Sequence, residues 1–271
     1  MRAPAVSGRF YPAGRAELEG VVRELLAEVE APEAAPARAA VAPHAGYQYS
    51  GVTAAHVFAR IEWPRVVVVL APNHTGACRV PGGASLWEDG AFRTPLGDVP
   101  VERALAAALL EACPLVGVDH EAHAREHAVE VEIPFLQVRR PDVAIVPLVL
   151  TWDGWDKSRT LGEDLAAVVR RWPEPVLLLA SSDLNHYEPA AVTERKDARA
   201  LEAVQALDGE ELLKRCRQEG ITMCGRVPTA AVLAAARALG AERGDVVDYR
   251  HSGWVAVAAR GVVGYAGVVI R

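Results

Sequence analysis

Four polar side chains suited to catalysis or metal binding stand shortly after apolar segments of the chain. They are His44, His74, Asp183 and His186. The apolar segments before them are nearly uninterrupted and rich in Val, Leu and Ala, as strands buried on both faces are. The carboxyl ends of parallel strands share one edge of an open sheet, and ligands bind there. We therefore expect these side chains to converge on one site, although they are far apart in the sequence.

His44 and His74 are the predicted metal ligands. Imidazole is a borderline ligand suited to Fe, Cu or Zn. Small residues next to each histidine allow the backbone to approach closely, and Asn73 or Thr75 is placed to fix the tautomer of His74. Because two histidines alone do not complete a metal site, a third donor is required.

Cys224 is the expected third ligand. It precedes a predicted helix that begins near Pro228, and both a helix N-terminus and a bound cation favour the thiolate form of cysteine. Cys78, only four residues after His74, is the rival donor. A small buried side chain without a ligand role is the other interpretation of Cys224.

A second functional group combines Asp183 with His186. A histidine held by a carboxylate is an effective general base near neutral pH, so we predict that His186 moves protons and that Asp183 orients it. His127 is expected to line the same pocket as a hydrogen-bond donor. Tyr47 and Tyr49 either cover the mouth of the pocket or fill the core.

Strands that alternate with helices predict an α/β fold, with a mostly parallel or mixed central sheet flanked by helices. The expected strands are residues 38–42, 65–70, 143–150, 176–180, 246–250 and 262–270. The expected helices are residues 18–29, 50–61, 101–112, 126–139, 157–171, 193–207, 209–218 and 228–239. Residues 81–100 predict a long loop or hairpin, and Ser50 is the expected N-cap of the second helix. His120 and His123 are expected on a solvated helix face shared with His127.

The composition indicates one globular domain that spans residues 1–271, with 51% hydrophobic residues. The net charge of −6 and the scattered Lys and Arg residues argue against nucleic acid or an anionic membrane as a partner. The absence of a signal peptide and of a long apolar run, together with cysteines that lack disulfide spacing, predicts a cytoplasmic protein. No phosphate-binding glycine motif and no GxSxG sequence occur, so the sequence gives no support to nucleotide hydrolysis or ordinary esterase chemistry.

Several motifs together resemble the Memo family over nearly the whole chain. They are residues 43–51 (PHAGYQYSG), 72–74 (PNH), 126–127 (EH), 181–186 (SSDLNH) and 224–226 (CGR), in the order seen in that family. The chain is most similar to the prokaryotic branch, the AmmeMemoRadiSam system protein B group. The family name implies an association with a radical-SAM protein and an Amme-type domain as possible partners.

The resemblance also implies a fold like that of class III extradiol ring-cleavage dioxygenases, which use non-haem Fe(II). By this resemblance His44, His74 and Cys224 look like the metal ligands, and His186 looks like the dioxygenase base. A thiolate stands where the dioxygenases have a carboxylate, so ring cleavage does not follow from the fold alone, and Cu or Zn is also accommodated. The two main hypotheses are an Fe(II)-dependent redox enzyme with a small-molecule substrate of unknown identity, and a metal-binding or partner-binding protein without turnover. A metal-free scaffold is the third.

Overall fold

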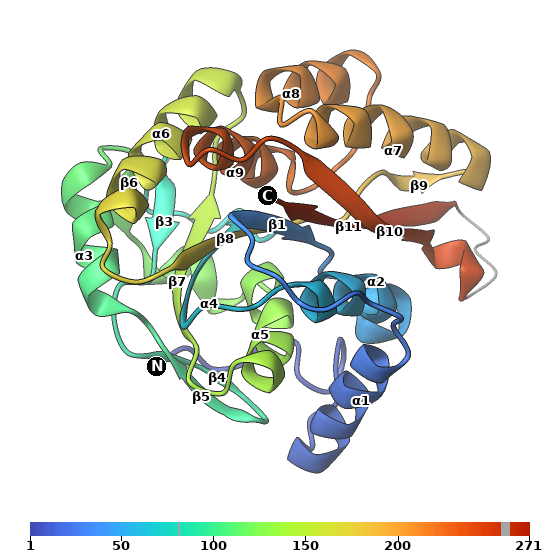
Figure 1. Ribbon diagram of the computed structural model, residues 1–271, viewed down its shortest axis with the longest axis horizontal. Helices are drawn as coiled ribbons and strands as arrows, with labels where there is room; N and C mark the ends of the chain where they lie inside the picture. Colours follow the sequence, from blue (N-terminus) through green and yellow to red (C-terminus); the bar gives the residue numbers. More distant parts are fainter. Residues whose placement is uncertain (81, 256–260) are drawn as a thin grey trace.

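A computed structural model describes residues 1–80, 82–255 and 261–271 of the chain. Its elements form a single α/β unit in which a mixed central sheet lies between layers of helices (Figure 1). This is the predicted fold class. The Val-rich and Leu-rich segments have no polar face that water could solvate. As strands they are therefore stable only where helices cover both faces of the sheet.

The sheet has a parallel centre and antiparallel additions. Within the described residues its order is β10-β11-β1-β8-β2-β7-β3-β6, and β9 pairs with β11. The strands are β1 (Ala39–Ala42), β2 (Val66–Pro72), β3 (Ala84–Leu86), β6 (Val116–Val118), β7 (Ala144–Leu150), β8 (Val176–Ser181), β9 (His186–Glu188), β10 (Gly244–His251) and β11 (Val262–Ile270). The neighbours β1, β8, β2 and β7 are parallel to one another, whereas β11 is antiparallel to β1 and β3 is antiparallel to β7. The carboxyl ends of the four central strands therefore meet at one edge.

Helices cover both faces of this centre. The helices are α1 (Arg15–Ala27), α2 (Tyr47–Arg60), α3 (Arg103–Ala112), α4 (His120–Ala124), α5 (Ala128–Arg139), α6 (Trp155–Arg171), α7 (Ala190–Gln205), α8 (Gly209–Gln218) and α9 (Arg226–Ala238), with a short 3-10 turn at Ser252–Trp254. One face carries α9 with α6 and α8 outside it, and the other carries α2 and α5 with α1 packed against both. The central strands therefore lie between two layers of helices (Figure 1).

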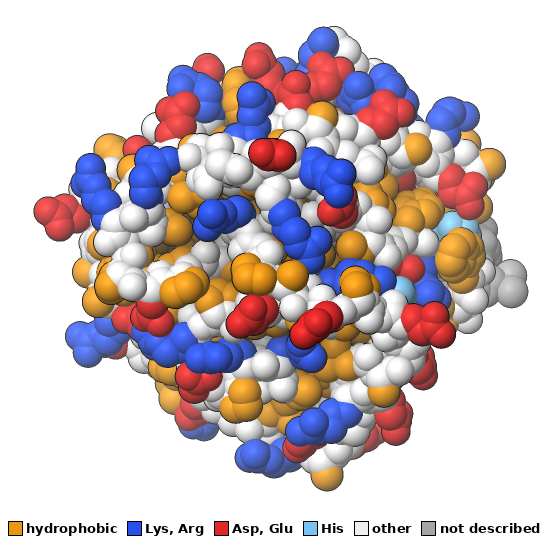
Figure 2. Space-filling view, viewed as in Figure 1, with side chains coloured by type: hydrophobic (Ala, Val, Ile, Leu, Met, Phe, Trp, Pro, Cys, Tyr) orange, Lys and Arg blue, Asp and Glu red, His pale blue; other side chains and the backbone are white. Residues whose placement is uncertain are grey.

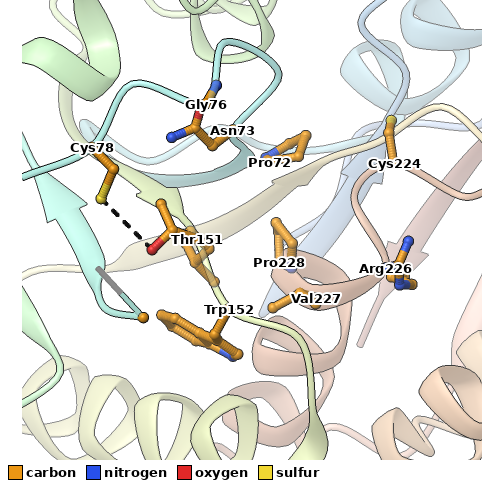
Figure 3. A pocket seen from close by; sticks show the side chains of 12 residues that line it. Pro72, Asn73, Gly76, Cys78, Thr151, Trp152, Cys224, Arg226, Val227 and Pro228 are labelled. Atoms are coloured by element: carbon orange, nitrogen blue, oxygen red, sulfur yellow. Dashed lines mark hydrogen bonds between the residues drawn. The ribbon is translucent and has the colours of Figure 1, made fainter. Parts of the chain in front are cut away.

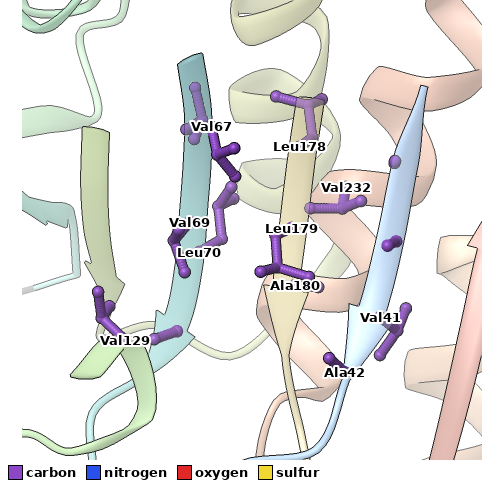
Figure 4. Close-up of a cluster of buried hydrophobic side chains, with 14 of the residues drawn as sticks. Val41, Ala42, Val67, Val69, Leu70, Val129, Leu178, Leu179, Ala180 and Val232 are labelled. Atoms are coloured by element: carbon purple, nitrogen blue, oxygen red, sulfur yellow. The ribbon is translucent and has the colours of Figure 1, made fainter. Parts of the chain in front are cut away.

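The core consists of aliphatic side chains from the parallel strands and the helices on either face. All seven residues of β2 and all six of β8 are buried. In Figure 4, Val67, Val69 and Leu70 of β2 lie beside Leu178 and Leu179 of β8. Burying such side chains contributes about 1.5–3 kcal/mol each relative to exposure. This rigid centre fixes the strand ends, and with them the loops that carry the polar residues.

The structure agrees with one local expectation and corrects others. Residues 91–100 form a hairpin of β4 (Ala91–Thr94) and β5 (Gly97–Pro100), in agreement with the expected loop or hairpin, while the short strands β3, β6 and β9 were not expected. Helix α2 begins at Tyr47 after Gly46, so Ser50 lies inside the helix and its hydroxyl donates to the Ala45 carbonyl at 3.1 Å. Short strands carry too few residues to show a clear alternation of apolar and polar positions.

The surface of the described residues shows mixed charge. On the face in Figure 2, basic and acidic side chains are interspersed rather than segregated. No helix among the described segments is both long and apolar enough to cross a membrane.

Candidate metal centre

Three histidines from separate parts of the chain meet at the carboxyl edge of the sheet. His44 follows β1, His74 follows β2, and His127 immediately precedes α5. The centroid of the His44 ring lies 5.1 Å from that of the His74 ring and 5.4 Å from that of the His127 ring. The centroids of the His74 and His127 rings are 4.6 Å apart. One potential ligand atom from each histidine lies within 4.8 Å of the others. The expected convergence of His44 and His74 is thus observed, and His127 joins them.

His44 is held in one orientation by the end of β8. It is 1% exposed, and its Nδ1 lies 2.8 Å from the Ser181 hydroxyl. That hydroxyl also contacts the Ala128 carbonyl at 3.0 Å and Glu132 Oε1 at 2.7 Å. Because a carbonyl can only accept, the single hydrogen of the Ser181 hydroxyl points to Ala128, and we assign the Nδ1 hydrogen to His44, which leaves the Nε2 lone pair for a ligand.

His74 is oriented by Glu126. Its Nδ1 lies 2.8 Å from Glu126 Oε1, and its backbone N–H donates to Oε2 at 2.5 Å. The predicted partners, Asn73 and Thr75, do not hold the imidazole: the Asn73 side chain instead accepts from the Thr75 and Gly76 backbone within its own turn. A carboxylate on Nδ1 directs the Nε2 lone pair of His74 away from Glu126, as in carboxylate–histidine–metal arrangements.

The same carboxylate fixes His127. Glu126 Oε1 accepts from the backbone N–H groups of His127 at 2.8 Å and Ala128 at 3.0 Å, at the start of α5. The His127 ring stacks on that of His74, with an interplanar angle of 25°. The His127 ring also contacts the Phe10 ring in an edge-on arrangement, with the two ring centroids 4.8 Å apart. Glu126 is only 2% exposed, so a single buried carboxylate positions two of the three imidazoles.

The protonation states suit cation binding. Burial lowers the pKa of His44 to about 3 and that of His127 to about 4, so both imidazoles are neutral at pH 7. Burial opposes charge on Glu126, but the hydrogen bond and charge of His74, the charge of His127 and the Ala128 backbone N–H together outweigh burial and lower the pKa of the carboxyl to about 2. For His74, burial is likewise outweighed by Glu126, which raises the pKa. The neutral imidazoles of His44 and His127 beside the fixed Glu126 carboxylate offer lone pairs and negative potential to a cation.

Cys224 lies against this cluster. Its Sγ is 3.3 Å from His44 Nε2 and 3.6 Å from the Asp183 carbonyl oxygen. The approach depends on Gly225, because a Cβ at that position would lie 2.4 Å from Ser182 Cβ and 2.5 Å from the Ser181 carbonyl oxygen. Burial raises the pKa of the Cys224 thiol, so thiolate formation here requires a compensating cation.

Cys224 also borders a second cavity, of about 500 Å³ (Figure 3). Asn73 and Cys78 line this second cavity rather than the one that contains the histidines. Cys78 contacts Ser85 and Thr151, each at 3.8 Å, and lies across the cavity from Cys224 in Figure 3. Of the two thiols weighed as a third ligand, it is Cys224 that contacts a histidine of the cluster.

His186 stands beside the cluster, and among the described residues only Nδ1 of its two ring nitrogens has a hydrogen-bond partner. Its Nδ1 lies 3.0 Å from the Thr222 carbonyl, and its backbone N–H donates to the Thr222 hydroxyl at 2.8 Å. A carbonyl only accepts, so the neutral ring carries its hydrogen on Nδ1 and has a basic Nε2. The expected orienting role of Asp183 is therefore taken by Thr222. Asp183 instead accepts from the His44 backbone N–H at 2.9 Å, and burial raises its pKa.

The histidine cluster opens into a cavity of about 380 Å³ with aromatic walls. Its lining residues include Arg9, Phe10, His44, Tyr49, His74, His127, Asp183, His186, Tyr187 and Tyr265. Tyr49 thus lines the cavity, which agrees with the first of its two predicted roles, at the pocket rather than in the core. Tyr47 takes the other role: it is 5% exposed, and its hydroxyl donates to the Val131 carbonyl at 2.8 Å.

His120 and His123 lie outside this cavity. Helix α4 ends at Ala124 and α5 begins at Ala128, so the helix face that was expected to carry His120, His123 and His127 together does not form. His123 is 1% exposed, and its Nε2 lies 2.8 Å from the Ser85 carbonyl, which corrects the expectation of a solvated position. His120 is half exposed and pairs with Glu88 at 2.7 Å. Both have structural roles.

Comparison with known proteins identifies the family. A family model described as Memo-like protein matches residues 2–269. The chain belongs to the Memo family. Similar relatives include the MEMO1 family protein MK0963 of Methanopyrus kandleri, 38% identical over 100% of this chain and 99% of that protein, and a MEMO1 family protein of Aquifex aeolicus, 39% identical over 99% and 98%.

A solved structure shares the fold of this Memo family chain. The uncharacterized protein JW3007 from Escherichia coli K12 matches with a TM-score of 0.58 and 18% identity, over 86% of this chain and 99% of that one. At that identity the likeness concerns the fold alone. Residues of the site that escaped the sequence analysis include Phe10, Thr222 and Tyr265. None of them follows a strand of the parallel centre. The prediction of His44 and His74 used polar residues just after such strands, so it could not identify these three.

Proposed function

We propose that this Memo family protein binds one transition metal at the histidine cluster and acts as a non-haem Fe(II)-dependent oxidoreductase of dioxygenase type. The observation that supports it best is the juxtaposition of three imidazoles, two of them with Nδ1 engaged by Ser181 or Glu126, with the basic Nε2 of His186 at the same cavity. Neutral imidazole with oriented Nδ1 groups suits Fe, Cu and Zn. Fe(II) is the expected ion in the cytoplasm, and Cu or Zn is the alternative.

The proposed ligands are His44, His74 and Cys224. The 3.3 Å separation between Cys224 Sγ and His44 Nε2 supports ligation, because a zinc-type centre with bonds of about 2.0 Å to nitrogen and 2.3 Å to sulfur holds its ligand atoms a few ångströms apart. His127 is a fourth donor at the same place. When bound, Fe(II) would supply the one-electron redox chemistry that reaction with O₂ requires.

The protein's own residues would handle the proton and the substrate. His186 Nε2 would accept a proton from an acidic hydroxyl of the substrate, while the Thr222 carbonyl stabilises the resulting imidazolium through Nδ1–H. Asp183, on the same cavity, would favour that positive charge electrostatically. Tyr49, Tyr265 and Phe10 form walls that exclude water and suit the flat face of an aromatic or otherwise chelating small molecule.

The first experiment tests metal binding and then turnover. Protein purified without oxygen is loaded with Fe(II), and O₂ consumption is followed with a panel of catechols and related chelating molecules. We expect consumption that is lost in His186→Gln without loss of bound iron, because this change removes the base and spares the ligands. Iron binding without O₂ consumption across the panel would refute the oxidoreductase.

Cobalt substitution identifies the third ligand. Thiolate ligation gives Co(II) an intense charge-transfer absorption that imidazole ligation does not. We expect this absorption in the wild type and in His127→Gln, and its loss in Cys224→Ser. Its persistence in Cys224→Ser would exclude the sulfur and leave the three histidines as the donor set.

The second candidate function is a metal carrier or a partner-binding protein without turnover, with partners of the radical-SAM and Amme-domain type. The thiol favours it, because sulfur with imidazole also holds Cu(I). Tight Cu(I) binding, together with the absence of O₂ consumption by the iron-loaded protein, would support this candidate over the enzyme. Retention of a radical-SAM protein on the immobilised chain would support the partner role.

A further inference from the structure

The first residues of the chain are built into the metal centre. Arg2 is 1% exposed, although a guanidinium is almost always charged and is rarely removed from water without partners. Its side chain forms a buried ion pair with Glu130 of α5 and donates to two backbone carbonyls, those of His123 at 3.1 Å and of Glu126. These two carbonyls flank the turn between α4 and α5.

That turn carries the groups that orient two of the imidazoles. Arg2 contacts the turn through the Glu126 carbonyl, and the Glu126 carboxylate holds His74 through Nδ1 and the backbone N–H. His127 is the next residue of the same turn, and its N–H is bound by the same carboxylate. A shift of this turn would therefore displace both His74 and His127.

Glu130 fixes the position of Arg2. Its carboxylate is fully buried and accepts from the backbone N–H groups of Ala5 at 2.7 Å and Val6 at 3.0 Å, and from the Tyr11 hydroxyl at 2.5 Å. The N-terminal segment then continues to Phe10, whose ring contacts His127. The segment thus meets the site at two points, one through Arg2 and one through Phe10.

A buried ion pair by itself is weak evidence of a stabilising role, because apolar side chains of the same volume often serve as well. What an apolar side chain cannot do is donate to two carbonyls and a carboxylate at once. The planar fork of arginine does so, and the compact ammonium of lysine does not reach three acceptors in different directions. The number and direction of the donors therefore indicate a positioning role.

We propose that Arg2 is a positioning residue of the metal centre: it fixes the turn that holds Glu126 and His127, and through Glu126 it sets the orientation of His74. The expected effect of Arg2 on metal affinity rests on the proposed metal site. The orientation of His74, in contrast, is also a property of the metal-free protein. Loss of a group that orients a metal-ligating histidine typically weakens metal affinity by about 10–100-fold.

The test compares Arg2→Lys with a matched control. Arg65 pairs with Glu102 at 2.7 Å and Glu174 at 2.5 Å next to the first residue of β2, the strand that leads to His74, so Arg65→Lys removes a similar fork at the opposite edge of the sheet. Hydrogen exchange of the His74 Nδ1–H is measured by NMR in the metal-free proteins, with the signal assigned through His74→Gln. Co(II) affinity is measured by absorption titration.

In Arg2→Lys we expect at least about tenfold faster exchange of the His74 Nδ1–H and at least about tenfold weaker Co(II) binding, with both within about twofold of wild type in Arg65→Lys. Unchanged exchange in Arg2→Lys, or equal effects in the two variants, would overturn the proposal. If Arg2→Lys fails to fold, Arg2→Gln combined with Glu130→Gln removes both charges and takes its place in the same measurements. Wild-type protein that binds no Co(II) would refute the metal site, while the exchange data would still decide the role of Arg2.

Discussion

Asp197 offers a quantitative test of how this protein tolerates a buried carboxyl. It lies on α7, is fully buried, and accepts from the Asn185 backbone N–H at 2.9 Å and from the Tyr249 hydroxyl at 2.8 Å. Gly264 packs so closely that a Cβ there would lie 1.9 Å from Asp197 Oδ2, which leaves no room for water. Burial raises the pKa of this carboxyl from 3.8 to about 7, despite the two hydrogen bonds.

The expected pH dependence follows from that shift. Between about pH 4 and pH 7 the native protein retains the proton that the unfolded chain has released, so the free energy of unfolding falls as the pH rises. A difference of about three pKa units, at about 1.36 kcal/mol each, gives a loss on the order of 4 kcal/mol, complete above the folded pKa. Asp197→Asn keeps the shape of the side chain and has no such titration. The stability of wild type relative to this variant should therefore decline across the interval.

The measurement is urea unfolding of both proteins at several pH values from about 4 to about 8. Taking the difference between them cancels the titration of groups that the two proteins share. Asp142→Asn, at a side chain that is 61% exposed, serves as the control for an Asp-to-Asn change outside the core. A difference between wild type and Asp197→Asn that stays constant, or that grows with pH, would refute the reasoning.

Three further predictions concern the metal centre. Glu126→Gln should weaken Zn(II) affinity about 10–100-fold in competition titrations, because the carboxylate that orients His74 is lost; wild-type affinity in this variant would contradict that role. Gly225→Ala should lower the free energy of unfolding by about 1–3 kcal/mol and abolish thiolate absorption by Co(II), because the added methyl group collides with the end of β8; a stable variant with full absorption would show that the close packing is not required. Saturating Co(II) should slow alkylation of Cys224 but not of Cys78, as measured by mass spectrometry of labelled peptides, and equal labelling with and without metal would argue against sulfur ligation.

The sequence by itself determined the parallel centre of the sheet and the meeting of His44 with His74. Both depend on patterns read over a few residues: buried apolar runs identify β1, β2 and β8, and a polar residue just after each run must lie at their common edge. The order of these strands in the sheet is not needed for that conclusion. The conclusion requires only that the strands are parallel, and the helices that connect them along the chain impose this parallel direction.

The tertiary structure decided which groups hold those histidines in place. Glu126 reaches His74 across 52 residues of chain, and Arg2 reaches Glu126 across 124. The turn between α4 and α5 places His127 beside His74, whereas the spacing of His120, His123 and His127 had indicated one shared helix face. Such contacts depend on where whole elements pack against one another, and local propensity does not encode that arrangement.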